Sequence, residues 1–148
     1  MNFRVDLDPT HRVIRLTVTA AVVTLTLAES CYFQLSKLAG RKPGKAEESN
    51  SGQYAAIYDL SAVTGTTITV AMIRNFARRA PSVPMGKPHV VVGKDPNIHE
   101  LARIFQMCRK YRLGHRFEVV RTLGEAYKLV EARPKDFTVR LYPKDVTA

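Results

Sequence analysis

The chain has 148 residues, a formal net charge of +10, 45% hydrophobic residues and 24% charged residues. These values are typical of one ordinary globular domain, and they exclude disorder as the main state of the chain. No apolar run reaches the roughly 18–20 residues of a membrane span, and the sequence does not open on an apolar leader. We therefore expect a soluble cytoplasmic protein whose two cysteines, Cys31 and Cys108, are buried free thiols.

The first predicted element is a β-hairpin. Residues 3–7 alternate apolar and polar side chains, and residues 13–19 are rich in β-branched side chains, as half-buried strands are. Asp8-Pro9-Thr10-His11 lies between these two segments and has the chemistry of a tight turn.

A helix is expected next, over residues 25–39. Its apolar side chains recur at three- and four-residue steps, and Thr24 or Thr26 can cap its start. Residues 40–52 contain almost no apolar side chain, which predicts a mobile loop. The nearly continuous apolar run 54–60 is typical of a central strand covered on both faces.

The rest of the chain alternates between helix and strand. A linker from Ser61 to Thr67 leads to a helix over residues 70–79, in which Val70 and Ala77 are predicted to point inward. The later elements are a buried strand over residues 89–92, a helix from Pro96 with Asp95 as its cap, a strand over 117–120, and a helix that begins with the capping box of Thr122 and Glu125.

The resulting order, β-β-α-β-α-β-α-β-α, predicts an α/β fold. We expect a mostly parallel mixed sheet of about five strands, four helices and an N-terminal hairpin. One domain should cover residues 1–133, with a C-terminal tail over residues 134–148. An apolar patch at residues 137–142 lets this tail dock on its own sheet or pair with another subunit, so a homodimer is an open alternative.

The positive charge is concentrated in residues 60–121, which contain eleven Lys or Arg and three acids, a net of +8. Such a surface attracts the phosphates of nucleic acid or of an anionic membrane. A solvated face that aids solubility explains the same composition. Few aromatic side chains accompany the basic ones, so we do not expect nucleic acid to be the main partner.

Few patterns in the sequence indicate catalysis. His11, His89, His99 and His115 have no partner at metal-ligand spacing and no CxxC motif is present, so we expect neither a metal nor another cofactor. The glycines are dispersed, and Gly65-Thr66-Thr67 lacks the lysine of a phosphate-binding loop. We therefore expect a protein that is not an enzyme.

The segment with the most polar chemistry joins the predicted central strand to the helix that follows it. Asp59 and Gly65 are candidates for organising this loop. Four hydroxyl side chains are candidate regulatory or phosphorylation sites: Ser61, Thr66, Thr67 and Thr69. The candidates for binding a partner, on the following helix, are Arg74, Arg78 and Arg79. Helix capping and turn formation explain the same polar residues without a regulatory role.

Asp59-Leu-Ser-Ala-Val63 resembles the end of the central strand in STAS domains, the fold of bacterial anti-sigma-factor antagonists. The chain is similar to the SpoIIAA-like, or STAS-like, family over about residues 4–130. The other segments that carry this similarity are Asp6-Leu-Asp-Pro-Thr-His-Arg-Val-Ile14, Tyr58-Asp-Leu-Ser-Ala-Val-Thr-Gly-Thr-Thr67, Ala77-Arg-Arg-Ala-Pro81 and Thr122-Leu-Gly-Glu-Ala126. The predicted order of elements also agrees with this family.

The resemblance implies a bacterial regulatory module. In the antagonists, a phosphorylated Ser at the start of the helix after the central strand switches binding to an anti-sigma factor. The corresponding positions, near Thr67 to Val70, lack the family's Asp, Ser and Gly, so Thr67 or Thr69 would have to replace the acceptor. The family is also noted for a fold similar to lipid-binding CRAL-TRIO domains, which implies a pocket for an apolar ligand.

These observations lead to a first expectation and to alternatives. The first is a non-enzymatic regulatory or protein-interaction module of STAS-like fold, which binds a protein through residues 61–70 and the helix after them. The alternative is a carrier or sensor of a lipid-like or other small apolar ligand, which the broad apolar face of the helix from Pro96 also favours. Binding of nucleic acid or an anionic membrane through residues 60–121 is a further alternative.

Overall fold

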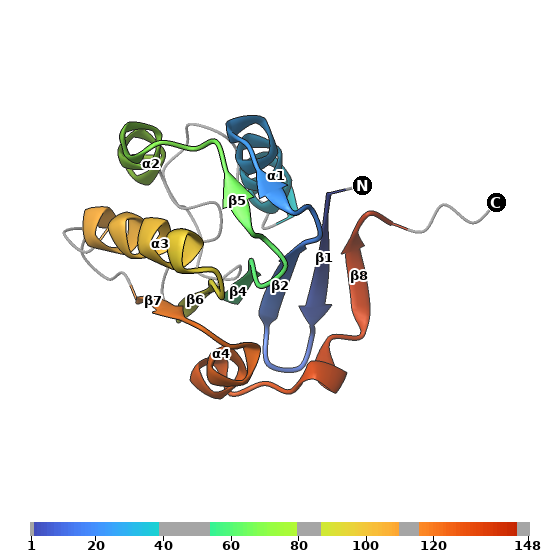
Figure 1. Ribbon diagram of the computed structural model, residues 1–148. Helices are drawn as coiled ribbons and strands as arrows, with labels where there is room; N and C mark the ends of the chain where they lie inside the picture. The colour runs from blue at the N-terminus through green and yellow to red at the C-terminus, as the bar shows by residue number, and fades with distance from the viewer. Residues whose placement is uncertain (1, 39–53, 80–86, 110–115, 145–148) are drawn as a thin grey trace.

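The computed structural model describes residues 2–38, 54–79, 87–109 and 116–144, and Figure 1 shows how they form a layered α/β structure. The main sheet has the strand order β7-β6-β4-β2-β1-β8. Its strands are β1 (Phe3–Asp8), β2 (Val13–Val18), β4 (Ala55–Asp59), β6 (His89–Val92), β7 (Phe117–Val120) and β8 (Val139–Tyr142). The described α-helices are α1 (Leu25–Leu38), α2 (Val70–Ala77), α3 (Pro96–Arg109) and α4 (Leu123–Val130).

This architecture confirms the predicted α/β class, the four helices and the mostly parallel mixed sheet. Neighbouring strands in the series β2, β4, β6 and β7 are parallel, whereas β1 is antiparallel to both β2 and β8. The sheet has six strands and not about five, because the C-terminal segment adds β8 at its edge. None of the described helices is long and apolar enough to cross a membrane.

The N-terminal hairpin forms as its sequence predicts. Strands β1 and β2 pair from Phe3 with Val18 to Asp8 with Val13. The buried carboxylate of Asp8 accepts hydrogen bonds from the backbone N–H groups of Thr10 and His11, at 3.0 and 3.1 Å. These bonds hold the turn, since an Asp side chain that binds backbone amides two and three residues ahead favours a reversal of the chain.

The C-terminal segment docks on its own sheet, and a homodimer stays a prediction. A short 3-10 helix (Pro134–Asp136) precedes β8, and β8 pairs with β1, with Tyr142 opposite Val5. The buried carboxylate of Asp6 accepts hydrogen bonds from Nε of Arg140 at 2.7 Å and from Nη2 of Arg15 at 3.3 Å. Charged groups from three adjacent strands therefore stabilise this edge of the sheet.

A second sheet, of two strands, is separate from the main sheet. The sequence did not predict it. It consists of β3 (Val22–Val23) and β5 (Gly65–Thr66), which are parallel. The backbone N–H groups of Thr64 and Gly65 both donate to the carbonyl of Ala21. The predicted linker from Ser61 to Thr67 is therefore partly a strand, and this strand ties the start of α2 to the start of α1.

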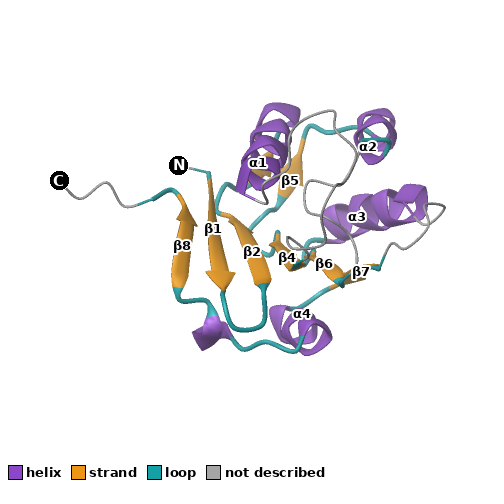
Figure 2. Cartoon of the chain, turned by 180° about the vertical axis from the view of Figure 1, so that it is seen from behind, coloured by secondary structure: helices purple, strands orange, loops and turns teal. Residues whose placement is uncertain are grey.

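The helices cover the two faces of the main sheet unequally. Figures 1 and 2 show α1, α2 and α3 on one face and α4 on the other. The parallel register places Leu16 beside Tyr58 and Tyr58 beside Val91 on the face of the three helices. The opposite face packs against α4 with these buried side chains: Val13, Ala55, Ile57, Val90, Val92, Ala126, Val130 and Ala132.

Two details of the helices differ from the predictions. Val70 was expected to point inward and is 39% exposed, because α2 packs against α3 and buries only Ala77 fully. Cys31 is buried as expected, whereas the Cys108 thiol is only half-buried; both thiols are free. The predicted loop 40–52 lies outside the described residues.

Candidate ligand-binding cavity

A cavity of about 230 Å³ lies between the main sheet and the three helices α1, α2 and α3. Four side chains of the sheet form one side of it: Leu16 and Val18 from β2, Tyr58 from β4, and Val91 from β6. The period-2 alternation of the strands brings these side chains to one face. The sheet side of the cavity is therefore part of the apolar face that the strand sequences encode.

The helices close the cavity with aliphatic and aromatic side chains. Cys31 and Leu35 of α1, Ile73 of α2 and Ile98 of α3 line it. Four aromatic rings form a continuous series along the helices and β7, with centroid separations of 5.5, 6.4 and 5.1 Å: Tyr32, Phe76, Phe105 and Phe117. Offset and edge-on rings at such separations attract one another, so they stabilise the enclosure.

The position of α2 explains why a space remains. This helix packs on α3 and stands away from the main sheet. Its side chains Met72, Ile73 and Phe76 contribute to the lining, yet only Ala77 is fully buried. A close-packed core normally leaves few voids larger than a water molecule, so the separation of α2 from the sheet is a departure from ordinary core packing.

An ion pair holds α2 beside α1. The guanidinium of Arg79 donates from both terminal nitrogens to the two carboxylate oxygens of Glu29. The Arg79 side chain also lies over the ring of Phe76, at 4.9 Å from its centroid. The hydrogen bonds from Arg79 lower the pKa of Glu29, and those to Glu29 raise the pKa of Arg79. Glu29 is therefore ionised at neutral pH, and the ion pair links α1 to the end of α2.

The polar groups in the lining are few. Tyr58 and His89 form a hydrogen bond between the hydroxyl and Nδ1, at 2.9 Å. Arg109, the last residue of α3, also lines the cavity and is only 4% exposed. Burial raises the pKa of the Cys31 thiol to about 12, so this sulfur is neutral at physiological pH and acts as an apolar group.

The size of the cavity suits a small ligand. An apolar cavity of about 150 Å³ takes up benzene. By proportion, a cavity of about 230 Å³ has room for about nine non-hydrogen atoms. The space and the lining together fit a short hydrocarbon chain or a small ring system.

The predicted loop residues Asp59 and Ser61 bind each other. The buried Asp59 carboxylate accepts hydrogen bonds from the backbone N–H of Ser61 at 3.0 Å and from its hydroxyl at 2.6 Å. Gly65 pairs with Val22 in the two-stranded sheet, and a Cβ added there would meet nothing nearer than 3.9 Å. Asp59 therefore holds Ser61 at the start of the loop, and a loop-organising role for Asp59 and Gly65 stays a prediction.

Two of the three predicted threonines have local structural partners. Thr66 donates its hydroxyl to the carbonyl of Val23 at 2.7 Å and accepts from the backbone N–H of Ile68. Thr69 is the N-cap of α2, and its hydroxyl accepts from the backbone N–H of Met72 at 3.2 Å. Thr67 is exposed. These contacts match the capping interpretation, and a phosphorylation role for any of these hydroxyls stays a prediction.

The three arginines predicted to bind a partner have different surroundings in the structure. Arg79 binds Glu29, as described above. Arg74 and Arg78 are exposed on α2 and border a surface depression together with Ala77 and Cys108. Roles for these arginines in binding a protein, a nucleic acid or an anionic membrane also stay predictions.

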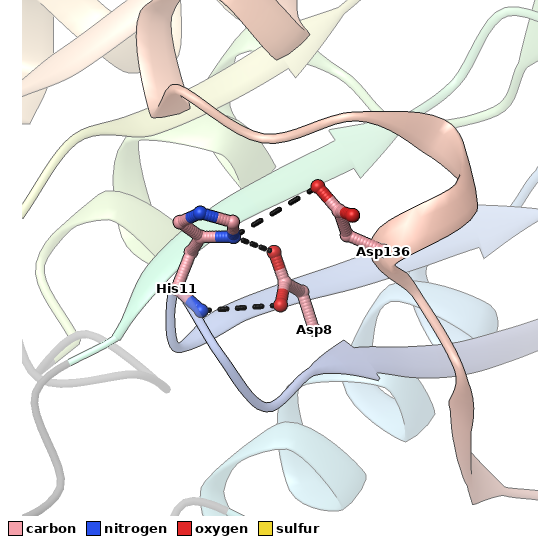
Figure 3. A group of neighbouring side chains, drawn as sticks. All are labelled: Asp8, His11 and Asp136. Carbon is pink, nitrogen blue, oxygen red and sulfur yellow. Dashed lines mark hydrogen bonds and ion pairs between the residues drawn. The ribbon is translucent and has the colours of Figure 1, made fainter.

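A cluster that the sequence did not predict joins the hairpin turn to the C-terminal segment (Figure 3). His11 Nδ1 lies 2.6 Å from Asp8 Oδ2 and 3.8 Å from Asp136 Oδ2. The prediction that His11 has no partner was therefore wrong. The backbone N–H of Arg133 donates to Asp136 and lowers its pKa. These three groups are near enough to share a metal ion, but their contacts are already explained by the turn and by the docked C-terminal segment.

No protein-family model, curated protein or solved structure matches this chain. The STAS-like resemblance therefore stays a prediction from the sequence motifs. The cavity was also not located from the sequence, although one signal pointed toward it: the broad apolar face of α3, which includes Leu101 and Phe105.

Proposed function

We propose that this protein is a non-enzymatic binding module that carries or senses a small apolar ligand, built on a STAS-like fold. One observation carries the proposal: an apolar cavity of about 230 Å³ between the sheet and three helices. This function was the alternative from the sequence, and the geometry favours it over the first expectation.

The apolar character of the cavity supports a role in binding. Its lining side chains are almost all aliphatic or aromatic. A bound apolar ligand would cover these side chains and bury its own surface, at about 25 cal/mol per Å² of apolar surface removed from water.

Native mass spectrometry of the protein purified from its own cells tests the proposal. We expect an additional mass that organic solvent releases. As a defined probe, 1-decanol should bind the ligand-free protein and raise its unfolding temperature. Ala102→Leu adds volume inside the cavity and should abolish binding, whereas the matched change Ala71→Leu, on the exposed side of α2, should not. Failure of 1-decanol to bind and the absence of an extractable mass would contradict the proposal.

A second candidate function is binding of a protein through α2. The observation that favours it is the exposure of Val70, Met72, Arg74 and Arg78 on this one short helix. Replacing Arg74 and Arg78 together with Ser should remove a specific partner in pull-down experiments and leave 1-decanol binding unchanged. Identical sets of captured proteins before and after the change would contradict this role.

A further inference from the structure

We propose that the ligand of the cavity is a planar aromatic compound of one or two rings, and that Phe76 and Phe105 select it over saturated hydrocarbons. The inference rests on the proposed function and specifies the class of its ligand. It comes from the concentration of aromatic rings on one side of the sheet, from the arrangement of these rings, and from the size of the space that they border.

Aromatic side chains are concentrated in the lining of the cavity. Five of the 24 lining residues are Phe or Tyr, whereas aromatic residues make up only 8% of the whole chain. By contrast, the buried side chains that pack between the sheet and α4 are all aliphatic. The same sheet therefore has an aliphatic core on one face and a lining rich in aromatic rings on the other.

Phe76 of α2 is a central member of the series of rings along the cavity. Its ring meets that of Tyr32 at an interplanar angle of 84° and that of Phe105 at 52°. The Phe105 ring meets that of Phe117 at 52° as well. These three pairs of neighbours are all tilted and not stacked face to face. The series therefore presents ring faces and ring edges in several directions along the lining.

Tilted rings favour an aromatic ligand for an electrostatic reason. An aromatic ring is negative on its two faces and positive at its edge, so rings attract one another edge to face. A planar aromatic ligand beside this series can place its edge against one ring face and its own face against another ring edge. Each such pair should add about two- to tenfold in affinity beyond the burial of apolar area. A saturated hydrocarbon of the same skeleton gains only the burial.

Two sulfur atoms in the lining favour the same class of ligand. Cys31 of α1 and Met72 of α2 both line the cavity, and Cys31 is a free thiol. Polarisable sulfur makes favourable contacts with aromatic rings at about 5 Å, often at the ring edge. Rings and sulfurs from three helices therefore act in the same direction.

The size of the cavity fits a compact ring system. Its room for about nine non-hydrogen atoms matches indane, a benzene ring fused to a five-membered ring. A fused ring system has no rotatable bonds, whereas an alkyl chain loses conformational freedom when it is held in a space of this size. A rigid planar ligand therefore binds at a smaller entropic cost than a flexible chain.

The test compares three hydrocarbons with the same number of carbon atoms: indane, cis-hydrindane, which is the saturated form of the same skeleton, and nonane. Headspace gas chromatography over a solution of the full chain gives a dissociation constant for each. Each constant is referred to the partition of the same compound between water and cyclohexane, so that differences in hydrophobicity cancel. On this scale indane should bind at least about threefold tighter than cis-hydrindane, and nonane should bind most weakly.

Variants assign the preference to the two rings. In Phe105→Leu the preference for indane should fall by at least about twofold, and in the double variant with Phe76→Leu it should disappear. Both changes keep an apolar side chain, so retained binding of cis-hydrindane shows that the cavity is intact. Phe76→Leu alone serves if Phe105→Leu does not fold. The matched control is Phe33→Leu, which removes an exposed ring of α1 outside the lining and should leave the preference unchanged.

The outcomes separate this inference from the proposed function. The inference is overturned if indane gains nothing over cis-hydrindane, if nonane binds as well as indane, or if the variants in the lining keep the full preference for indane. Binding of cis-hydrindane, nonane or 1-decanol in any of these cases leaves the apolar cavity as a ligand site. If neither the three hydrocarbons nor 1-decanol bind the wild-type protein, both the inference and the proposed function are overturned.

Discussion

The two faces of the main sheet differ in how closely their side chains are packed. On one face, the single helix α4 packs small and β-branched side chains closely, and Ile57 and Ala126 are fully buried there. On the other face, three helices contribute larger aliphatic and aromatic side chains, yet a cavity remains. More covering helices have therefore produced a less filled core.

This difference teaches that helix number does not decide packing density. A helix fills a core when its apolar stripe lies directly on the sheet, as α4 does with Ala126 and Val130. By contrast, α2 packs on another helix and closes the cavity from outside. We infer that the α4 face supplies much of the stability and that the opposite face contributes less because it is less filled.

The largest expected contrast comes from shortening one side chain on each face. Ile57→Ala should lower the free energy of unfolding by about 3 kcal/mol, because it opens a void in a closely packed region. Leu101→Ala should cost less, about 2 kcal/mol in the ligand-free protein, because Leu101 is only half-buried beside the cavity. Urea unfolding measures both values. Equal losses would show that the two faces are equally well packed in solution.

The reverse change, from a small to a large side chain, should also affect the stability of the two faces differently. Ala126→Leu has no space to enter beneath α4 and should destabilise the protein by about 1–3 kcal/mol. Ala102→Leu projects into the cavity and should change the unfolding free energy by less than about 1 kcal/mol. Thermal unfolding of both ligand-free variants checks this. A large loss for Ala102→Leu would argue that the cavity is already filled by the chain itself.

The N-caps of α2 and α4 allow a matched comparison between the faces. Thr69 and Thr122 accept hydrogen bonds from Met72 and Glu125, both at 3.2 Å. Removing either hydroxyl by substitution with Ala should cost about 1 kcal/mol of helix stability. In Thr122→Ala the loss should reduce global stability, whereas Thr69→Ala should mainly open α2 locally.

Hydrogen exchange followed by mass spectrometry separates these two results. Amides of residues 70–77 should exchange faster in Thr69→Ala while those of the main sheet keep their rates. Thr69→Ser, which retains the capping oxygen, serves as the control. Faster exchange throughout the sheet would show that α2 belongs to the cooperative core and is not a separately opening cover.

The smallest effect concerns the ion pair between α1 and α2. Both side chains of this pair are more than one-third exposed, so Glu29→Gln should cost less than about 1 kcal/mol. Because the pKa of Glu29 is lowered in the folded protein, the stabilisation is present above the ordinary value of 4.5 and is lost as the pH falls through the lowered pKa. The difference in unfolding temperature between wild type and variant should therefore disappear in acid. A difference that persists in acid would contradict this origin.

Much of the fold could be predicted because its signals are local. Alternation of side chains indicated β1, and a high content of β-branched side chains indicated β2. The cap residues Asp95 and Thr122 marked the starts of α3 and α4. The β3–β5 pair was missed because two residues are too few to show a period. The inward prediction for Val70 was wrong because helical periodicity assumes a sheet below the helix, and α2 has a helix beside it.

The candidate site was less accessible to sequence reasoning. The hydroxyls of residues 61–69 attracted a regulatory hypothesis because residue type does not distinguish a cap from an acceptor of phosphate. The cavity depends on distances between elements far apart in the chain, such as β2 and α3. Likewise, the burial of the Arg109 side chain could not be predicted, since a charged residue at a helix end is ordinarily exposed to solvent.

The pairing of β8 with β1 has a consequence for how the protein is made. During synthesis on the ribosome, β1 and β2 emerge long before β8, so β1 has no outer neighbour until residues 139–142 leave the exit tunnel. Until then one edge of β1 remains unpaired, and the negative charge of Asp6 lacks the guanidinium of Arg140 that later covers it. An unpaired strand edge is where nascent chains associate wrongly. The sheet therefore gains its outer strand only after residues 139–142 are made, and a chain that lacks these residues would keep an unpaired edge at β1.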